Sequence, residues 1–246
     1  LKQVPPNTHH HLDLFHHSVE TVRQVQLLYE NAPDVVKAHM EAVDFGGAAR
    51  LAHLKLAAFL HDIGKFSTWT IEEGTGRHRF IKHDDAGAKL SVPLLKKMNF
   101  SNKQIDYVSS MIRNHIYPSQ VMSAPEINDK IMMRFVRKME DNSADLILLA
   151  QADRLSAQGE AITKEVVEKN INLLNRLLDF YLNVKDSLEP LPVLLDGNDV
   201  MKMLNIKPSK QLGEIMNVLH EAQMSGDITT KEQAEAFIVN LFNQRT

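Results

Sequence analysis

Residues 61–65 read His61-Asp62-Ile63-Gly64-Lys65, and they directly follow the apolar run from Leu51 to Leu60. The run predicts a buried helix, so a histidine and a carboxylate stand side by side at its end. Burying two ionisable groups is costly unless other groups or a metal ion satisfy them. Further candidate ligands are widely spaced along the chain; they are His17, His83, His115 and Asp153. This spacing indicates a metal site assembled from separate helices.

The bulk composition is that of a globular chain with a sizeable core. Its 246 residues are 43% hydrophobic, and the net charge of −3 gives no global electrostatic case for nucleic-acid binding. The absence of cysteine excludes disulfides, thiolate zinc sites and cysteine nucleophiles. The remaining nitrogen and oxygen ligands suit Mn, Fe, Co, Ni, Zn or Mg. No apolar run approaches the roughly 20 residues of a membrane span and no signal peptide is visible, so we expect a cytoplasmic protein without a membrane partner.

Helical periodicity runs through nearly the whole chain, and strand signals are nearly absent. The sequence therefore predicts an all-α fold with a helical bundle, a long connecting helix and a small C-terminal helical appendage. We expect these parts in residues 1–160, 161–190 and 191–246, with Pro190 and Pro192 forming a hinge. The predicted helices span residues 12–29, 48–61, 84–98, 101–115, 129–138, 144–156, 163–188, 198–204 and 209–224, and a last one starts at 230.

Local signals mark several helix ends. Ser101 and Thr230 are each followed three residues later by a glutamine, as in a capping box. Gly64 is placed to act as the C-terminal cap of the helix over 48–61. The mixed-charge segment 67–79 contains Gly74 and Gly76, and it predicts an exposed loop.

Helices in a bundle can direct ligands from distant parts of a chain to one point. We expect four such ligands, and they are His17, His61, Asp62 and Asp153. Val19 is expected close to the core, which puts His17 near the core boundary. His16 lies about 100° further around the same helix and is the poorer ligand candidate.

His83 and His115 have two functional interpretations. They bind a second metal ion with Asp62 as the bridge, or they hold the phosphate of a substrate; surface histidines near helix ends are the ordinary alternative. Lys65 and, less strongly, Arg154 could neutralise a phosphoryl oxygen in the transition state, and solvated side chains are the alternative. Asp62 is the residue expected to orient an attacking water while it remains a ligand.

The order His, His-Asp, His, His, Asp resembles the pattern of the HD-domain metal-dependent phosphohydrolases. That resemblance implies an HD-domain helical bundle that holds one or two divalent ions. The segments 11–17 and 82–88 and the tail from 191 to 200 are similar to parts of bacterial CCA-adding tRNA nucleotidyltransferases and related poly(A) polymerases. Residues 213–215 and 221–228 continue this likeness, which covers about 11–156 and 191–240 in total.

The chain departs from that family where nucleotide transfer takes place. The nucleotidyltransferase head needs a Gly-rich turn followed by a closely spaced pair of carboxylates, and Gly46-Gly47 has no such pair after it. We therefore expect that this polypeptide alone does not add nucleotides. Either the head has been cut away, which the Leu1 start fits, or the protein is a free-standing relative.

The leading hypothesis is a metal-dependent phosphohydrolase, either a phosphatase or a phosphodiesterase, that uses metal-activated water on a nucleotide or RNA-end phosphate ester. One alternative is a helical body that binds tRNA or other RNA in tRNA processing. Its candidate phosphate contacts are Lys202, Lys207, Lys210 and Lys231. Another alternative is a nucleotide-sensing module that binds without hydrolysis. Metal-dependent turnover would support the hydrolase, salt-dependent RNA binding without turnover would support the helical body, and nucleotide binding without product would support the sensing module.

Overall fold

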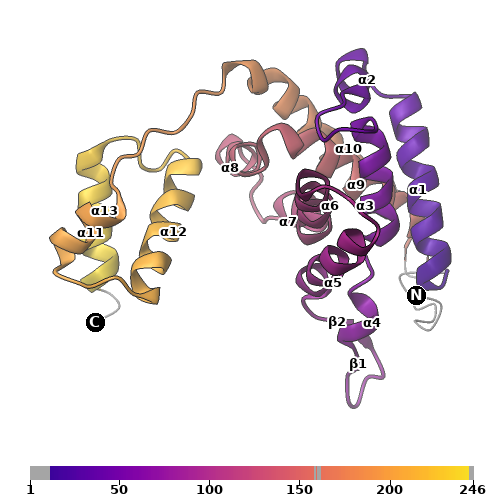
Figure 1. Cartoon of the computed structure of the whole chain (residues 1–246), viewed down its shortest axis with the longest axis horizontal. Coiled ribbons are helices and arrows are strands. Elements are labelled where there is room, and N and C mark those ends of the chain that lie inside the picture. Colours follow the sequence, from indigo (N-terminus) through magenta and orange to yellow (C-terminus); the bar gives the residue numbers. More distant parts are fainter. Residues whose placement is uncertain (1–11, 158, 160–161, 244–246) are drawn as a thin grey trace. The chain divides into compact units, whose positions relative to one another are not determined.

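The computed structural model describes residues 12–157, 159 and 162–243, and these residues are helical almost throughout (Figure 1). The all-α prediction is confirmed, because the described residues contain one two-stranded sheet and no larger one. His11, the first residue of the resemblance noted above, lies outside the described residues. The helices and strands are α1 (Leu14–Glu30), α2 (Asp34–Glu41), α3 (Arg50–Leu60), α4 (Lys65–Thr68), β1 (Trp69–Ile71), β2 (His78–Phe80), α5 (His83–Lys97), α6 (Asn102–Asn114), α7 (Tyr117–Val121), α8 (Asp129–Met139), α9 (Ser143–Ser156), α10 (Lys164–Val184), α11 (Gly197–Leu204), α12 (Lys210–Met224) and α13 (Lys231–Asn243).

The chain divides into two compact units. The first unit contains the residues up to 124 together with 141–179, and the second contains 125–140 and 180–246. Helix α8 therefore belongs to the second unit although it precedes α9 along the chain. All of the candidate site residues belong to the first unit.

Helix α9 lies at the centre of the first unit, and each of its residues from Ser143 to Ala152 is buried. Helix α1 packs against α9 and α3, α3 packs against α6, and α6 packs against α5. Leu54, Met111 and Leu146 are fully buried in these helices. Each such side chain contributes about 1.5–3 kcal/mol by leaving water. This packing fixes the helix ends that carry the candidate ligands.

A buried polar network ties the start of α3 to the start of α9. The fully buried Asp145 accepts hydrogen bonds from His39 Nε2 at 2.7 Å, Arg50 Nε at 2.8 Å and Tyr107 Oη at 2.5 Å. Burial alone would raise the pKa of Asp145, but the hydrogen bond from His39 and the charge of Arg50 outweigh burial and lower it. Three of the candidate ligands, His61, Asp62 and Asp153, stand at the opposite ends of the same two helices.

Helix α1 turns inward a face that the apolar pattern does not reveal. Val19 is 46% exposed, whereas His17 is only 1% exposed, so the expectation that Val19 lies close to the core is wrong. The buried residues of the helix are Leu14, His17, Ser18, Thr21 and Val25. Three of these residues are polar. A search for regularly spaced apolar residues therefore does not detect this buried face.

The segment predicted as an exposed loop contains a short helix and a hairpin. Strands β1 and β2 are antiparallel, with Trp69 opposite Phe80 and Ile71 opposite His78. Only the turn between them, which includes Gly74 and Gly76 at positive φ, matches the loop prediction. Strands of three residues are too short for an alternating pattern to be recognised. The sequence does not predict the short helices α2 and α7 either, because eight and five residues are too few to show a helical repeat of apolar residues.

Two capping predictions are confirmed. The side chain of Ser101 accepts from the backbone of Gln104, and the side chain of Gln104 accepts in return from the backbone of Ser101. At the start of α13, Gln233 N donates to Thr230 Oγ1 at 3.3 Å and Thr230 N donates to Gln233 Oε1 at 3.2 Å. Such reciprocal bonds satisfy backbone donors that a helix end leaves without partners.

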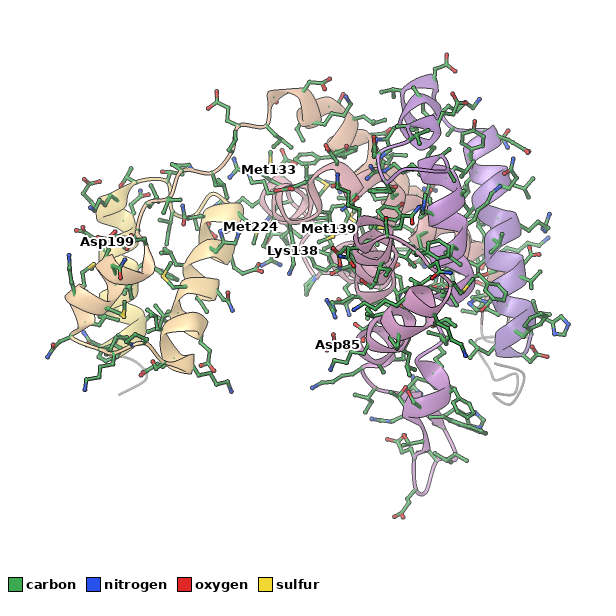
Figure 2. The ribbon with its side chains drawn as sticks, in the orientation of Figure 1. Asp85, Met133, Lys138, Met139, Asp199 and Met224 are labelled. Carbon is green, nitrogen blue, oxygen red and sulfur yellow. The ribbon has the colours of Figure 1, made fainter. Side chains whose placement is uncertain are left out.

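The second unit has a small core of its own between α11, α12 and α13. This core consists of Leu195, Val200, Ile215, Leu219, Ile228, Ala234 and Ile238. Helix α8 packs against α12; Figure 2 labels Lys138 of α8 and Met224 of α12. Lys138 Nζ lies 3.3 Å from Glu221 Oε1. Among the described residues, no helix combines the length and the apolar character that crossing a membrane requires.

Candidate metal centre

Six ionisable side chains from different parts of the first unit, including Asp62, form one cluster. Most of them stand at helix ends: His61 and Asp62 follow α3, His83 begins α5, and His115 follows α6. Helix α1 adds one histidine from its first turn, and α9 adds one aspartate from its last turn. The six residues are His17, His61, Asp62, His83, His115 and Asp153.

The first group of donor atoms faces Asp62 Oδ2. His17 Nε2 lies 3.3 Å from His61 Nε2 and 3.1 Å from Asp153 Oδ1. His61 Nε2 lies 3.5 Å from Asp153 Oδ1. The two histidine nitrogens are 3.6 Å and 3.3 Å from Asp62 Oδ2. The structure thus brings together the four residues that the sequence predicts as metal ligands.

The second group of donor atoms faces the other oxygen of the same carboxylate. His83 Nε2 lies 3.2 Å and His115 Nε2 3.7 Å from Asp62 Oδ1. The two histidine nitrogens are 3.2 Å apart. Asp62 therefore stands between two pairs of histidines and turns one oxygen to each pair.

The second ring nitrogen of each histidine has a partner in the protein. His61, His83 and His115 each place Nδ1 2.7–2.9 Å from the backbone carbonyl oxygen three residues earlier. A carbonyl can only accept, so each Nδ1 carries a proton and each Nε2 is the ring nitrogen that faces the cluster. This is the orientation that a metal-ligating histidine requires.

His17 is held by hydroxyl groups instead. Its Nδ1 lies 3.2 Å from Ser156 Oγ, which donates to the carbonyl of Asp153 at 2.8 Å and lies 2.9 Å from Thr21 Oγ1. The hydroxyl proton of Thr21 goes to the carbonyl of His17 at 2.9 Å. Neither hydroxyl then has a proton left for the ring, so His17 Nδ1 donates to Ser156 Oγ and Nε2 faces His61. The contacts of these two hydroxyls with His17 are not predicted from the sequence. The spacing could have indicated them, because Thr21 follows His17, and Ser156 follows Asp153, by about one helical turn.

The two predicted phosphate-binding residues, Lys65 and Arg154, differ in their contacts with the cluster. Lys65 is buried, and its Nζ lies 2.5 Å from Asp62 Oδ2. Arg154 makes no hydrogen bond or ion pair with the described residues of the cluster. His16, the neighbour of His17, lies outside the cluster, with Nδ1 2.8 Å from Asp13 Oδ2 on the surface.

Burial and neighbouring charges together shift the pKa values of the cluster. Burial alone would lower the pKa of His61, but the charges of Asp62 and Asp153 raise it to about 10. Burial and the positive charge of His61 lower the pKa of His115 to about 4. Burial alone would raise the pKa of Asp62, yet Lys65 and His61 hold it well below its usual range. Hydrogen bonds from two histidines do the same for the pKa of Asp153, so both carboxylates are ionised at neutral pH.

Gly64 has a different function from the one that its position suggests. It is not a left-handed helix cap, because its φ is −68°, and the cap of α3 is His61. A Cβ atom at Gly64 would lie 2.0 Å from the carbonyl oxygen of His83 and 2.5 Å from the backbone nitrogen of Gly87. Glycine therefore allows the start of α5 to approach the metal-ligand loop closely, which brings His83 to Asp62.

The donor set fits divalent cations. Both oxygens of Asp62 are buried, and neither accepts a hydrogen bond of acceptable geometry from the described residues, although Lys65 and the histidines approach them. Ligand atoms held at about 2.1 Å from one ion lie about 3.0–3.4 Å from each other. The separations of 3.1–3.6 Å in the first group and 3.2–3.7 Å in the second are close to this range.

Comparison with known proteins agrees with this geometry. The model of the HD-domain family matches residues 14–158, which include all six residues of the cluster. The chain is 29% identical over 229 residues to the A-adding tRNA nucleotidyltransferase of Deinococcus radiodurans. It is 30% identical over 230 residues to the CC-adding tRNA nucleotidyltransferase of Thermus thermophilus. Both likenesses noted in the sequence analysis are thereby confirmed.

The two alignments cover the chains very unequally. They include 93% and 94% of this chain but only 46% and 45% of the relatives. The chain thus spans slightly less than half the length of the curated relatives it matches, and the likeness extends through both of its compact units.

Proposed function

This chain belongs to the HD-domain family, and we propose that it is a metal-dependent phosphohydrolase acting on the phosphate ester of a nucleotide or an RNA end. The observation that carries the proposal is the position of Asp62. Its buried carboxylate turns one oxygen to His17 and His61 and the other to His83 and His115. Such an arrangement suits a carboxylate that bridges two cations.

We assign the ligands by these distances. His17, His61, Asp62 and Asp153 would hold one divalent ion, and His83 and His115, together with Asp62, would hold a second. Each group leaves room for water or substrate, since three or four protein ligands do not fill an octahedral shell. Metal-bound sites of this kind lower the pKa of water and polarise a phosphoryl oxygen.

The remaining functions fall to the side chains themselves. Asp62 is ionised, so it only accepts hydrogen bonds and can orient the attacking water while it ligates. Lys65 offsets the negative charge of this carboxylate and can contact a phosphoryl oxygen as charge develops there. Ser156, which contacts Thr21, accepts from His17 Nδ1 and so holds the ring with Nε2 toward His61 and Asp153. We assign no function in hydrolysis to Arg154.

The experiment compares metal content and turnover in the same samples. The purified chain is stripped of metal, reloaded with Mn, Ni, Co, Zn or Mg, and assayed on AMP, 2′,3′-cyclic AMP and a short RNA with a 3′-phosphate. His61→Ala and Asp62→Ala should each abolish metal-dependent turnover while the helical signal is retained. His16→Ala is the matched control, because His16 is a neighbouring histidine on the surface of α1. Wild-type turnover in Asp62→Ala would contradict the proposal.

A second candidate function is RNA binding without turnover. It is favoured by the extent of the alignments, which run through the second unit of the chain as well as the HD domain. Its expected contacts are Lys202, Lys207, Lys210 and Lys231. Salt-dependent tRNA binding without metal-dependent turnover would support this candidate over the hydrolase, and nucleotide binding without product would indicate a sensing module.

A further inference from the structure

The hairpin beside the metal centre gathers its aromatic and apolar side chains on one face. Alternation along each strand puts Trp69 and Ile71 of β1 on the same side as their cross-strand partners Phe80 and His78. The rings of Trp69 and His78 lie 5.4 Å apart at an interplanar angle of 47°. Ile71 is 59% exposed. We call Trp69, Ile71, His78 and Phe80 the hairpin face.

This hairpin face continues directly from the candidate metal centre. The carbonyl of Phe80 accepts from Nδ1 of His83, whose Nε2 lies 3.2 Å from Asp62. The ring of Phe80 lies 5.5 Å below Nζ of Lys65, which contacts the same carboxylate. From Phe80 to His78 the strand runs about 7 Å away from the centre. In Figure 1 the hairpin extends beyond α4 and α5, the helices next to it.

Two buried ring nitrogens of the hairpin face are not satisfied by hydrogen bonds within the described part of the chain. Neither Trp69 Nε1 nor His78 Nδ1 has a hydrogen-bond partner among the described residues, so no polar contact fixes these two nitrogens. Close by, Phe66 of α4 and Ile81 after β2 are 54% and 64% exposed. Exposed apolar side chains gathered in this way mark a binding surface more often than scattered ones do.

The charges around the hairpin face favour a phosphate-bearing ligand. Arg77 and Lys82 flank β2, and neither forms an ion pair with the described residues. The carboxylate of Glu72 is already bound by Arg79 and by the hydroxyl of Thr75. Lys65, with Nζ 5.5 Å from the ring of Phe80, adds a cation beside an aromatic ring of the face, and surfaces that bind single-stranded nucleic acids combine aromatic rings with cations.

We infer that the hairpin face is the base-binding part of the site: a nucleobase stacks on Trp69 and His78 while the phosphate of the same ligand lies at the metal centre. This inference rests on the proposed function and assigns the part of the site that binds the base of its substrate. Stacking is tolerant of base identity, because every base has a π face, so recognition here is of a base and not of a sequence. The ligand is a free nucleotide or the single-stranded end of an RNA.

Trp69 is the single tryptophan of the chain, so its fluorescence reports on this hairpin alone. Titration with AMP should quench or shift the emission, and titration with ribose 5-phosphate, which lacks the base, should not. A trinucleotide RNA with a 3′-phosphate that acts at much lower concentration than AMP identifies an RNA end as the source. Equal responses to AMP and ribose 5-phosphate, or no response to either, overturn the inference even where turnover exists.

Turnover supplies an independent readout. Trp69→Leu should lower kcat/KM for AMP about 5- to 100-fold, the usual effect of losing one stacked base, and leave kcat/KM for ribose 5-phosphate unchanged. Trp69→Phe should restore most of the loss, and Thr70→Ala is the matched control because Thr70 lies on the opposite face of β1. An equal loss on both esters would assign Trp69 a purely structural role and refute the inference while leaving the hydrolase intact. If neither ester is turned over, the proposed function fails, and the fluorescence titration alone decides about the hairpin face.

Discussion

Replacing Gly64 by alanine tests how the start of α5 reaches the metal centre. The added Cβ would lie 2.0 Å from the carbonyl oxygen of His83, whereas carbon and oxygen atoms that are not bonded to each other stay about 3.3 Å apart. The first turn of α5 must therefore retreat by about 1.3 Å. His83 moves with it, and its contact with Asp62 at 3.2 Å lengthens to a distance at which both cannot ligate one ion.

The magnitudes follow from this displacement. Forcing extra volume into a packed site costs about 1–3 kcal/mol, and a backbone clash belongs at the upper end of that range. For a chain of this size, a loss of about 3 kcal/mol lowers Tm by roughly 6–12 °C. A misplacement of about 1 Å in a catalytic group lowers kcat about 100-fold. Gly64→Ala should therefore lose stability, metal content and turnover together.

Alanine variants of two other glycines show whether the loss is specific to Gly64 or follows from any replacement of glycine by alanine. At Gly87 the new Cβ would lie 3.1 Å from a methyl of Ile112, so Gly87→Ala should cost less than Gly64→Ala. At Gly213, inside α12, nothing lies within 4 Å of the new Cβ, and Gly213→Ala should stabilise by about 0.5–1 kcal/mol. Thermal unfolding and metal content per chain are the assays. A Gly64→Ala protein with wild-type Tm and metal content would refute the reasoning.

Three further changes probe other parts of the first unit. Ser156→Ala removes the hydroxyl that orients His17 and should weaken metal binding about 10- to 100-fold by calorimetry, whereas Ser91→Ala, at a buried serine of α5, should not. Asp145→Asn should cost about 3–5 kcal/mol in urea unfolding at pH 7. Because the pKa of Asp145 is lowered in the folded state, its contribution is complete above the unfolded pKa of about 3.9 and disappears as pH falls through the lower folded value; a gap between wild type and variant that stayed constant down to pH 2 would contradict this. Lys82 has a φ of 59°, so Lys82→Gly should raise stability by about 1 kcal/mol and Lys82→Val should lower it, as measured by thermal unfolding.

The sequence predicts the helices because their apolar faces repeat over three or more turns, and it predicts their caps because capping is local. Ser101 with Gln104 and Thr230 with Gln233 are examples in which a few neighbouring residues suffice. The candidate ligands can be predicted from the sequence equally well. Each stands at a helix end or one turn inside it, and their order along the chain is specific to a family.

Features that depend on distant contacts could not be predicted in the same way. Gly64 looked like a cap, but its lack of a side chain matters only because α5, which begins 19 residues later along the chain at His83, packs against it. The inward face of α1 is formed partly by Thr21 and Ser18, whose burial depends on partners from other helices. The hairpin is too short to have its own pattern, although it places the single tryptophan beside the centre.

Anomalous diffraction from crystals loaded with Mn²⁺ tests the central claim most directly. The account predicts one peak in contact with His17, His61, Asp153 and one oxygen of Asp62, and a second peak between His83, His115 and the other oxygen. Crystals of Asp62→Ala should lose both peaks. A wild-type crystal with no peak at Asp62, or with peaks only at other residues, would contradict the account.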